Sequence, residues 1–149
     1  MNGRLRTAAV LSLLGSAAAA QHVGDCSQFA AAAALVEPWE ENSATFANGE
    51  VRLAVLDTIE PAAAAYHLLV LSPPYDEVGA RQCRVISLGQ GIGFAFVEMA
   101  SLEAAYDPNV GLIFKLNTPG YAPDVDGARN RLLTFTLNQS SGVINAYLD

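Results

Sequence analysis

The chain has 149 residues and is acidic, with fifteen Asp and Glu side chains against eight Lys and Arg, a net charge of −7 at neutral pH. The few basic side chains are scattered along the sequence. This argues against nucleic acid and anionic membrane surfaces as partners, because both require clustered Lys and Arg to neutralise phosphate. The length suits one domain with a core of ordinary size.

The N-terminus has the three-part order of a secretory signal peptide. Arg4 and Arg6 precede an apolar stretch, and small residues follow as far as Ala20. The stretch is shorter than the roughly 20 apolar residues of a membrane-spanning helix. We predict that residues 1–20 are removed, with cleavage after Ala20 or alternatively after Ala18. Residues 21–149 are then a single β-rich domain, periplasmic or extracellular, with no transmembrane segment.

This mature domain is more acidic than the whole chain, since it keeps six cations and all fifteen acids, for a net charge of about −9. It also contains both cysteines, Cys26 and Cys83. Outside the cytoplasm such a pair most simply forms one disulfide, and we predict the bond Cys26–Cys83. A metal-binding or redox pair is the alternative, and the absence of a Cys-x-x-Cys motif argues against it.

An Ala-rich stretch at residues 27–36 predicts a short N-terminal helix, because Ala has the highest helix propensity and Pro38 follows as a stop signal. Beyond it, strand-like runs alternate with turn residues such as Asn48-Gly49. The first four predicted strands are residues 51–58, 66–71, 81–88 and 94–99.

Two of these strands carry further information. The run at residues 66–71 is apolar except for His67, a pattern typical of a central strand covered on both faces. Ser72-Pro73-Pro74 is predicted to end it, since proline donates no hydrogen bond to a β-ladder. The glycine-rich residues 89–93 predict a hairpin rather than a phosphate-binding loop, and residues 101–106 one helical turn.

The last third of the chain has the clearest alternation. Strands at residues 112–117, 132–137 and 143–148 each present one strongly apolar face, and the loop 138–142 predicts a β-hairpin. About seven antiparallel strands must hide their apolar faces against one another. The predicted fold class is therefore all-β, an antiparallel sandwich or partly closed barrel with a short N-terminal helix.

The sequence contains no recognised motif for a catalytic nucleophile. His67, inside an apolar strand, is more typical of a hydrogen-bonded core residue than of a catalytic base. Glu98 is the carboxylate of interest, because Phe94 and Phe96 are expected to alternate onto its face and burial would raise its pKa. We predict no catalytic residue and no cofactor, and keep a small hydrolase that uses Glu98 or His67 as the alternative.

A metal site also receives little support. Asp124-Val125-Asp126-Gly127 is similar to the start of a calcium loop, but the register places Ala122 and Leu133 at ligand positions, which excludes an EF-hand. An Asx-rich turn is the favoured interpretation and a looser calcium site the alternative. We predict no metal ligand.

Three aromatic residues near prolines, Trp39, Tyr75 and Tyr121, are predicted to lie in loops, where exposed Trp and Tyr commonly form recognition surfaces. The alternative is that they cover the open ends of the sandwich. Tyr75 is the most informative of the three. Two prolines before it would stiffen its loop and so reduce the entropy lost on binding.

Taken together, the signal peptide, the Ala-rich stretch, the single disulfide and β-runs such as Val51-Arg52-Leu53-Ala54-Val55-Leu56-Asp57-Thr58 resemble small uncharacterised exported proteins of alphaproteobacteria. The resemblance covers most of the chain and implies no activity. We expect a non-catalytic exported domain that binds a protein or cell-envelope ligand through Trp39, Tyr75 and Tyr121. An enzyme inhibitor is a further alternative, and the sequence assigns no oligomeric state.

Overall fold

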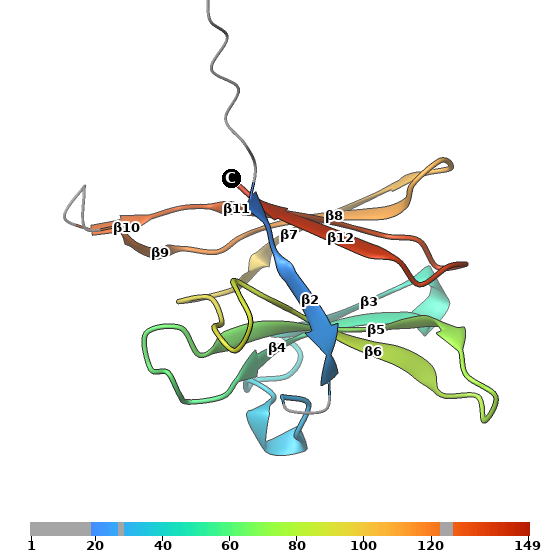
Figure 1. The fold of residues 1–149 in the computed structure, drawn as a ribbon, viewed down its shortest axis with the longest axis horizontal. Helices are drawn as coiled ribbons and strands as arrows, with labels where there is room; N and C mark the ends of the chain where they lie inside the picture. Colours follow the sequence, from blue (N-terminus) through green and yellow to red (C-terminus); the bar gives the residue numbers. More distant parts are fainter. Residues whose placement is uncertain (1–18, 27–28, 123–126) are drawn as a thin grey trace, which may run out of the picture.

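The computed structural model describes residues 19–26, 29–122 and 127–149. Two five-stranded antiparallel sheets lie face to face (Figure 1). Sheet A has the strand order β1-β12-β11-β8-β7, and sheet B has the order β2-β6-β5-β4-β3. The predicted all-β, antiparallel class is confirmed, and the arrangement is a sandwich rather than a closed barrel.

The strands of sheet A are β1 (Ala19–Ala20), β7 (Glu98–Asp107), β8 (Gly111–Asn117), β11 (Leu132–Leu137) and β12 (Ile144–Leu148). Those of sheet B are β2 (His22–Asp25), β3 (Ser43–Phe46), β4 (Val51–Asp57), β5 (Tyr66–Tyr75) and β6 (Arg81–Ser87). A small two-stranded ribbon extends from sheet A and consists of β9 (Gly120–Ala122) and β10 (Gly127–Arg129). Two short 3-10 turns complete the described elements, η2 (Ala32–Ala34) and η3 (Ala47–Gly49).

The main core lies between the two sheets, because alternate residues of each strand point inward. In β11 the inward residues Leu133, Phe135 and Leu137 are fully buried, as the sequence alternation predicted. The rings of Phe114 and Phe135 stack at 4.8 Å within sheet A. Phe46 of sheet B meets the Phe114 ring edge-on at 4.9 Å, which joins the two sheets directly.

A second, smaller core covers the outer face of sheet B. Leu56, Leu69 and Val85 point outward from β4, β5 and β6, and they are buried beneath residues 29–42, which we call the strap. Phe29 and Leu35 of the strap pack on these side chains. The strand β5 is therefore central and buried on both faces, which confirms the interpretation of its continuous apolar run.

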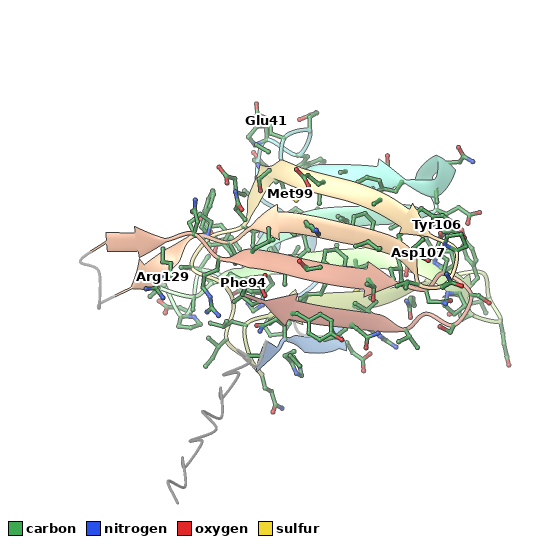
Figure 2. The ribbon with its side chains drawn as sticks, turned by 90° about the horizontal axis from the view of Figure 1, so that it is seen from above. Glu41, Phe94, Met99, Tyr106, Asp107 and Arg129 are labelled. Carbon is green, nitrogen blue, oxygen red and sulfur yellow. A yellow bond between two sulfur atoms is a disulfide. The ribbon has the colours of Figure 1, made fainter. Side chains whose placement is uncertain are left out.

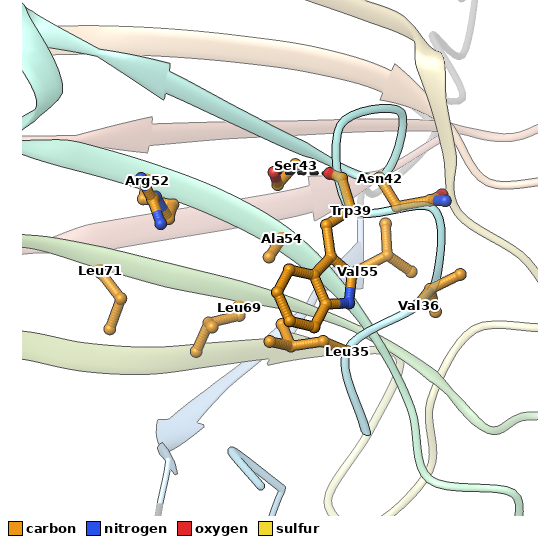
Figure 3. A pocket seen from close by; sticks show the side chains of 10 residues that line it. All are labelled: Leu35, Val36, Trp39, Asn42, Ser43, Arg52, Ala54, Val55, Leu69 and Leu71. Carbon is orange, nitrogen blue, oxygen red and sulfur yellow. Dashed lines mark hydrogen bonds between the residues drawn. The ribbon is translucent and has the colours of Figure 1, made fainter. Parts of the chain in front are cut away.

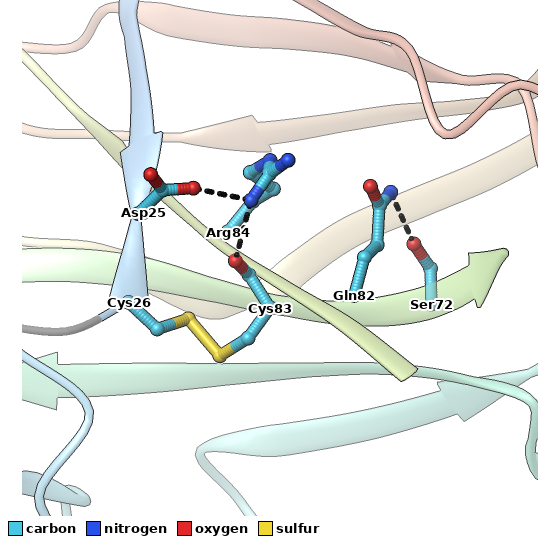
Figure 4. The surroundings of a disulfide bond; sticks show 6 residues. All are labelled: Asp25, Cys26, Ser72, Gln82, Cys83 and Arg84. Atoms are coloured by element: carbon cyan, nitrogen blue, oxygen red, sulfur yellow. Dashed lines mark hydrogen bonds and ion pairs between the residues drawn. A yellow bond between two sulfur atoms is a disulfide. The ribbon is translucent and has the colours of Figure 1, made fainter. Parts of the chain in front are cut away.

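The predicted disulfide between Cys26 and Cys83 is present, with the two Cα atoms 5.5 Å apart (Figure 4). It joins Cys26, which follows β2, to β6, and the backbone N–H groups of Phe29 and Ala30 at the start of the strap donate to the Cys26 carbonyl at 3.0 Å. Asp25 and Arg84 pair directly beside it, and the Arg84 guanidinium also donates to the Cys83 carbonyl at 3.2 Å. The bond thus fixes one end of the strap to the sheet that the strap covers.

The predicted N-terminal helix is wrong. Of residues 27–36, positions 27–28 lie outside the described residues, and the remainder contains only the 3-10 turn η2. Leu35 forms an isolated bridge with Leu56, and the Val36 N–H donates to the Val55 carbonyl at 3.0 Å. The stretch follows the sheet instead of coiling, because its apolar side chains are buried best by lying flat on the outer face of sheet B.

Three strand boundaries also differ from the prediction. The strand β5 continues through Pro73 and Pro74 to Tyr75, since its ladder with β6 is interrupted by a bulge between Ser72 and Tyr75 that leaves the prolines no pairing to make. Residues 94–97 precede β7 rather than forming a strand. The predicted helical turn at 101–106 is part of β7. The two main sheets contain ten strands instead of about seven, because the strands β1, β2 and β3 were not predicted.

The predicted hairpin with the loop 138–142 is confirmed, whereas the one predicted at residues 89–93 is only a tight turn, because no strand follows it at residues 94–97. Gly142 closes the loop between β11 and β12 with a positive φ of 75°, and its N–H donates to the Asn138 carbonyl at 2.7 Å. Gly89 and Ile92 exchange backbone hydrogen bonds of 3.0 and 3.2 Å in the glycine-rich turn.

Sheet A is seen face-on in Figure 2, with Met99 near the start of β7 and Tyr106 and Asp107 at its far end. No helix among the described residues is long and apolar enough to cross a membrane.

Candidate functional site

A groove of about 170 Å³ opens on the outer face of sheet B, where the strap leaves part of the sheet uncovered (Figure 3). Ala54 of β4 and Leu69 and Leu71 of β5 line it, together with Leu35 of the strap. These side chains point outward because their chain neighbours fill the core between the sheets. The groove is therefore an open continuation of the outer core.

Trp39 lies along this groove with 55% of its surface exposed (Figure 3). Its backbone belongs to a tight turn of the strap. The Ser43 hydroxyl donates to the Trp39 carbonyl at 2.7 Å, and the Asn42 side-chain amide donates to the Pro38 carbonyl at 3.1 Å. The turn is thus held in place while the indole ring stays accessible.

Arg52 supplies the charge of the groove. It lies between Val51 and Leu53, both fully buried, so its own side chain points outward, opposite Thr45 on β3 and Leu71 on β5. It is the single charged residue among those that line the groove. Within the described part of the chain it forms no hydrogen bond or ion pair. The Arg52 guanidinium thus borders an apolar surface and has no partner among the residues that the structure describes.

Tyr75 lies on the same face as Trp39 and Arg52, farther along β5. It is the last residue of that strand and is 50% exposed, rather than lying in the predicted proline-stiffened turn. It stands opposite Arg81 on β6, and directly opposite residues of an antiparallel pair share a face. The turn itself begins at Asp76, whose carboxylate accepts backbone N–H bonds from Val78 and Ala80.

Two of the sequence predictions fall near the tip of the β9–β10 ribbon. Tyr121 belongs to β9, but its side chain lies outside the described residues, as do Asp124, Val125 and Asp126 of the suspected calcium loop. Where the structure does describe the chain, no group of three or more His, Cys, Asp or Glu residues gathers in a way that suits a metal ion.

His67 is buried completely on the strap side of β5. Its Nδ1 and the Ser87 hydroxyl share a hydrogen bond of 2.7 Å, and its Nε2 lies 3.5 Å from the Thr58 hydroxyl. The imidazole stacks on the ring of Phe29 at 4.5 Å. Burial lowers the pKa of His67 below its ordinary value, which favours the neutral imidazole.

The backbone next to this histidine approaches closely. A Cβ atom at Gly93 would lie 2.4 Å from the Tyr66 carbonyl oxygen and 3.0 Å from Nε2 of His67, so the position requires glycine. Ser87 borders a hollow of about 200 Å³ together with His22, Asp25 and Gln90, yet only 1% of Ser87 is exposed. Both His67 and Ser87 are therefore buried, although the hollow lies next to Ser87.

Glu98 begins β7, in the other sheet from His67, so the two residues of the hydrolase alternative belong to different layers. Its carboxylate accepts a hydrogen bond from the Asn117 side chain at 3.1 Å. Phe94 and Phe96 do not share a face as expected. Phe94 is buried, whereas Phe96 is 47% exposed and meets the Tyr66 ring edge-on at 5.5 Å, because these residues precede the regular strand.

The sequence analysis identified Trp39 and Tyr75 but missed Arg52, Leu69 and Leu71. A signal was available for Arg52. It interrupts the apolar run of β4, and a charged residue within a strand that is otherwise apolar on both faces marks a place where the outer face reaches solvent. Leu69 and Leu71 gave no such signal, since their alternation alone does not reveal where the strap ends.

No protein family, no curated protein and no solved structure matches this chain, so the groove is interpreted from its own chemistry.

Proposed function

We propose that this protein is a non-catalytic, exported domain that binds a protein or cell-envelope ligand on the uncovered part of sheet B. The observation that carries the proposal is that Trp39 and Arg52 line an apolar groove while Tyr75 is exposed farther along the same face. Trp, Tyr and Arg are the residue types that contribute most to binding energy at protein interfaces. Because hydrogen bonds hold the backbone of the Trp39 turn in place, little conformational entropy is lost when the exposed indole ring binds a partner.

Export is supported by the disulfide, since such bonds persist in oxidising compartments. The strand β1 bears on where the signal peptide ends. Ala19 and Ala20 pair with Leu148 and Tyr147 of β12, so cleavage after Ala20 would remove this strand and cleavage after Ala18 would retain it. The sandwich thus favours the second of the two sites.

The hydrolase alternative is less well supported than binding. A nucleophile and its base must reach the substrate, and both Ser87 and His67 are enclosed, at 1% and 0% exposure. Their hydrogen bond resembles the satisfied polar contact of a core residue. An enzyme inhibitor remains compatible with the proposal, because an inhibitor is a binding domain whose partner is an enzyme.

The test compares capture of a partner by three forms of the domain, comprising residues 19–149, from an extract of the envelope of its host cell. Trp39→Ala should lose at least tenfold in capture relative to the unaltered domain. Tyr147→Ala is the matched control, because Tyr147 is an aromatic residue of similar exposure, 42%, on the outer face of sheet A. Equal loss in both variants, or in neither, would refute the proposed binding face.

A further inference from the structure

The groove combines two properties that together specify a ligand. Its lining is apolar apart from a few polar groups, and the guanidinium of Arg52 lies at its border with no partner among the described residues. We propose that it binds an apolar side chain of a partner protein that is followed at once by a carboxylate, the side chain entering the groove and the carboxylate pairing with Arg52. This inference rests on the proposed function.

The size of the groove favours a protein segment over a free small molecule. Pockets for drug-sized ligands usually have about 300–1,000 Å³, whereas a dry cavity of about 150 Å³ holds one benzene molecule. At about 170 Å³ this groove matches a single aliphatic or aromatic side chain. One anchor of that size binds weakly alone, so it suits one contact within a larger protein interface.

The charge pattern favours an anion over a cation. Arg52 is the charged residue of the lining, and none of the described residues that line the groove carries a carboxylate. Arg81, on the same face, is already occupied, since its guanidinium donates to the carbonyls of Gly49 and Glu50 at 3.2 Å. Glu40 and Glu41 of the strap turn are exposed and oppose an anionic partner, but solvent screens exposed charges over a Debye length of about 8 Å at physiological salt.

Trp39 provides a direct reporter, because it is the sole tryptophan of the chain and it lines the groove. The probes are three blocked peptides of identical length, with Leu-Asp, Leu-Asn or Leu-Lys between flexible Gly-Ser segments. Titration of the domain at physiological salt, followed by Trp39 fluorescence, should show binding in the millimolar range for a single anchor. The Leu-Asp peptide should bind about two- to fivefold more tightly than Leu-Asn, the range expected for an exposed ion pair.

Arg52→Gln should reduce that ratio to one without abolishing binding of either peptide. Lys115→Gln is the matched control, since it removes the same charge from the outer face of sheet A, and it should leave the ratio unchanged. Equal affinities for Leu-Asp and Leu-Asn in the unaltered domain would overturn the proposal, as would tighter binding of Leu-Lys, which would assign the selectivity to Glu40 and Glu41.

Failure of this inference is distinguishable from failure of the proposed function. If the peptides leave Trp39 fluorescence unchanged while Trp39→Ala still prevents capture of the partner, the binding face stands and the ligand chemistry is wrong. If Trp39→Ala leaves capture unchanged, the binding face itself is wrong.

Discussion

The outer faces of the two sheets differ in whether their side chains must be covered from solvent. Both sheets contribute their inner faces to one core, but sheet B also carries outward apolar side chains such as Leu56 and Leu69, and these need a cover. Sheet A points Thr134, Lys115 and Tyr147 outward and needs none. A sheet that is apolar on both faces depends on a further chain segment for cover, and where that segment stops short, an apolar groove stays open.

The largest loss of stability is expected when the strap is released from sheet B. Replacing Cys26 and Cys83 by serine removes a link across 57 residues, and on the chain-entropy account this lowers the free energy of unfolding by about 4 kcal/mol. Thermal unfolding of the double variant should shift downward by about 10 °C or more. The native domain under reducing conditions should show the same shift. A shift of less than about 2 °C would mean that packing alone holds the strap.

A second test compares one residue from each outer face. Leu56 is fully buried under the strap, so Leu56→Ala should lower the free energy of unfolding by about 3 kcal/mol, measured by urea denaturation. Thr134→Ala, on the uncovered face of sheet A, should cost less than about 1 kcal/mol. Similar costs at both positions would show that the strap contributes little to burial.

The smallest expected effect concerns pH. Because burial lowers the pKa of His67 below 6.5, the unfolded chain binds its proton more readily than the folded one. The free energy of unfolding should therefore decrease as the pH falls from about 6.5 through the lowered pKa, and level off below it. His67→Gln should remove this pH dependence, whereas His22→Gln, which leaves the buried imidazole in place, should retain it. Persistence of the slope in His67→Gln would assign it to other groups.

The sequence predicted best where local pattern and tertiary environment agree. The alternation in β8, β11 and β12 was sufficient because these strands face the core on one side and solvent on the other. The run at the start of β5, apolar except for His67, correctly indicated burial on both faces. In these strands the burial of each side chain follows directly from its position in the repeat.

Prediction failed where pairing partners overrode local propensity. Residues 98–107 are rich in Ala and Glu, which favour helices, yet they form β7 because β8 offers a ladder to pair with. The Ala-rich stretch forms no helix beyond the 3-10 turn η2 for a similar reason, since Leu35 pairs with Leu56 of β4. The candidate site shows the same limit, since Trp39 and Tyr75 were identifiable from composition, whereas the groove exists only because the strap crosses part of sheet B.

The path of the N-terminal segment has a consequence for the order of folding. Sheet B is otherwise a run of neighbouring strands from β3 to β6, and sheet A a run of strands from β7 onward, so each half assembles largely from contacts close in sequence. The segment before the strap supplies one edge strand to each half, and β1 pairs with β12, the last strand of the chain. The residues of β1 therefore reach their place only after β12 has formed, so the pairing that ties the N-terminal segment to sheet A closes late in folding.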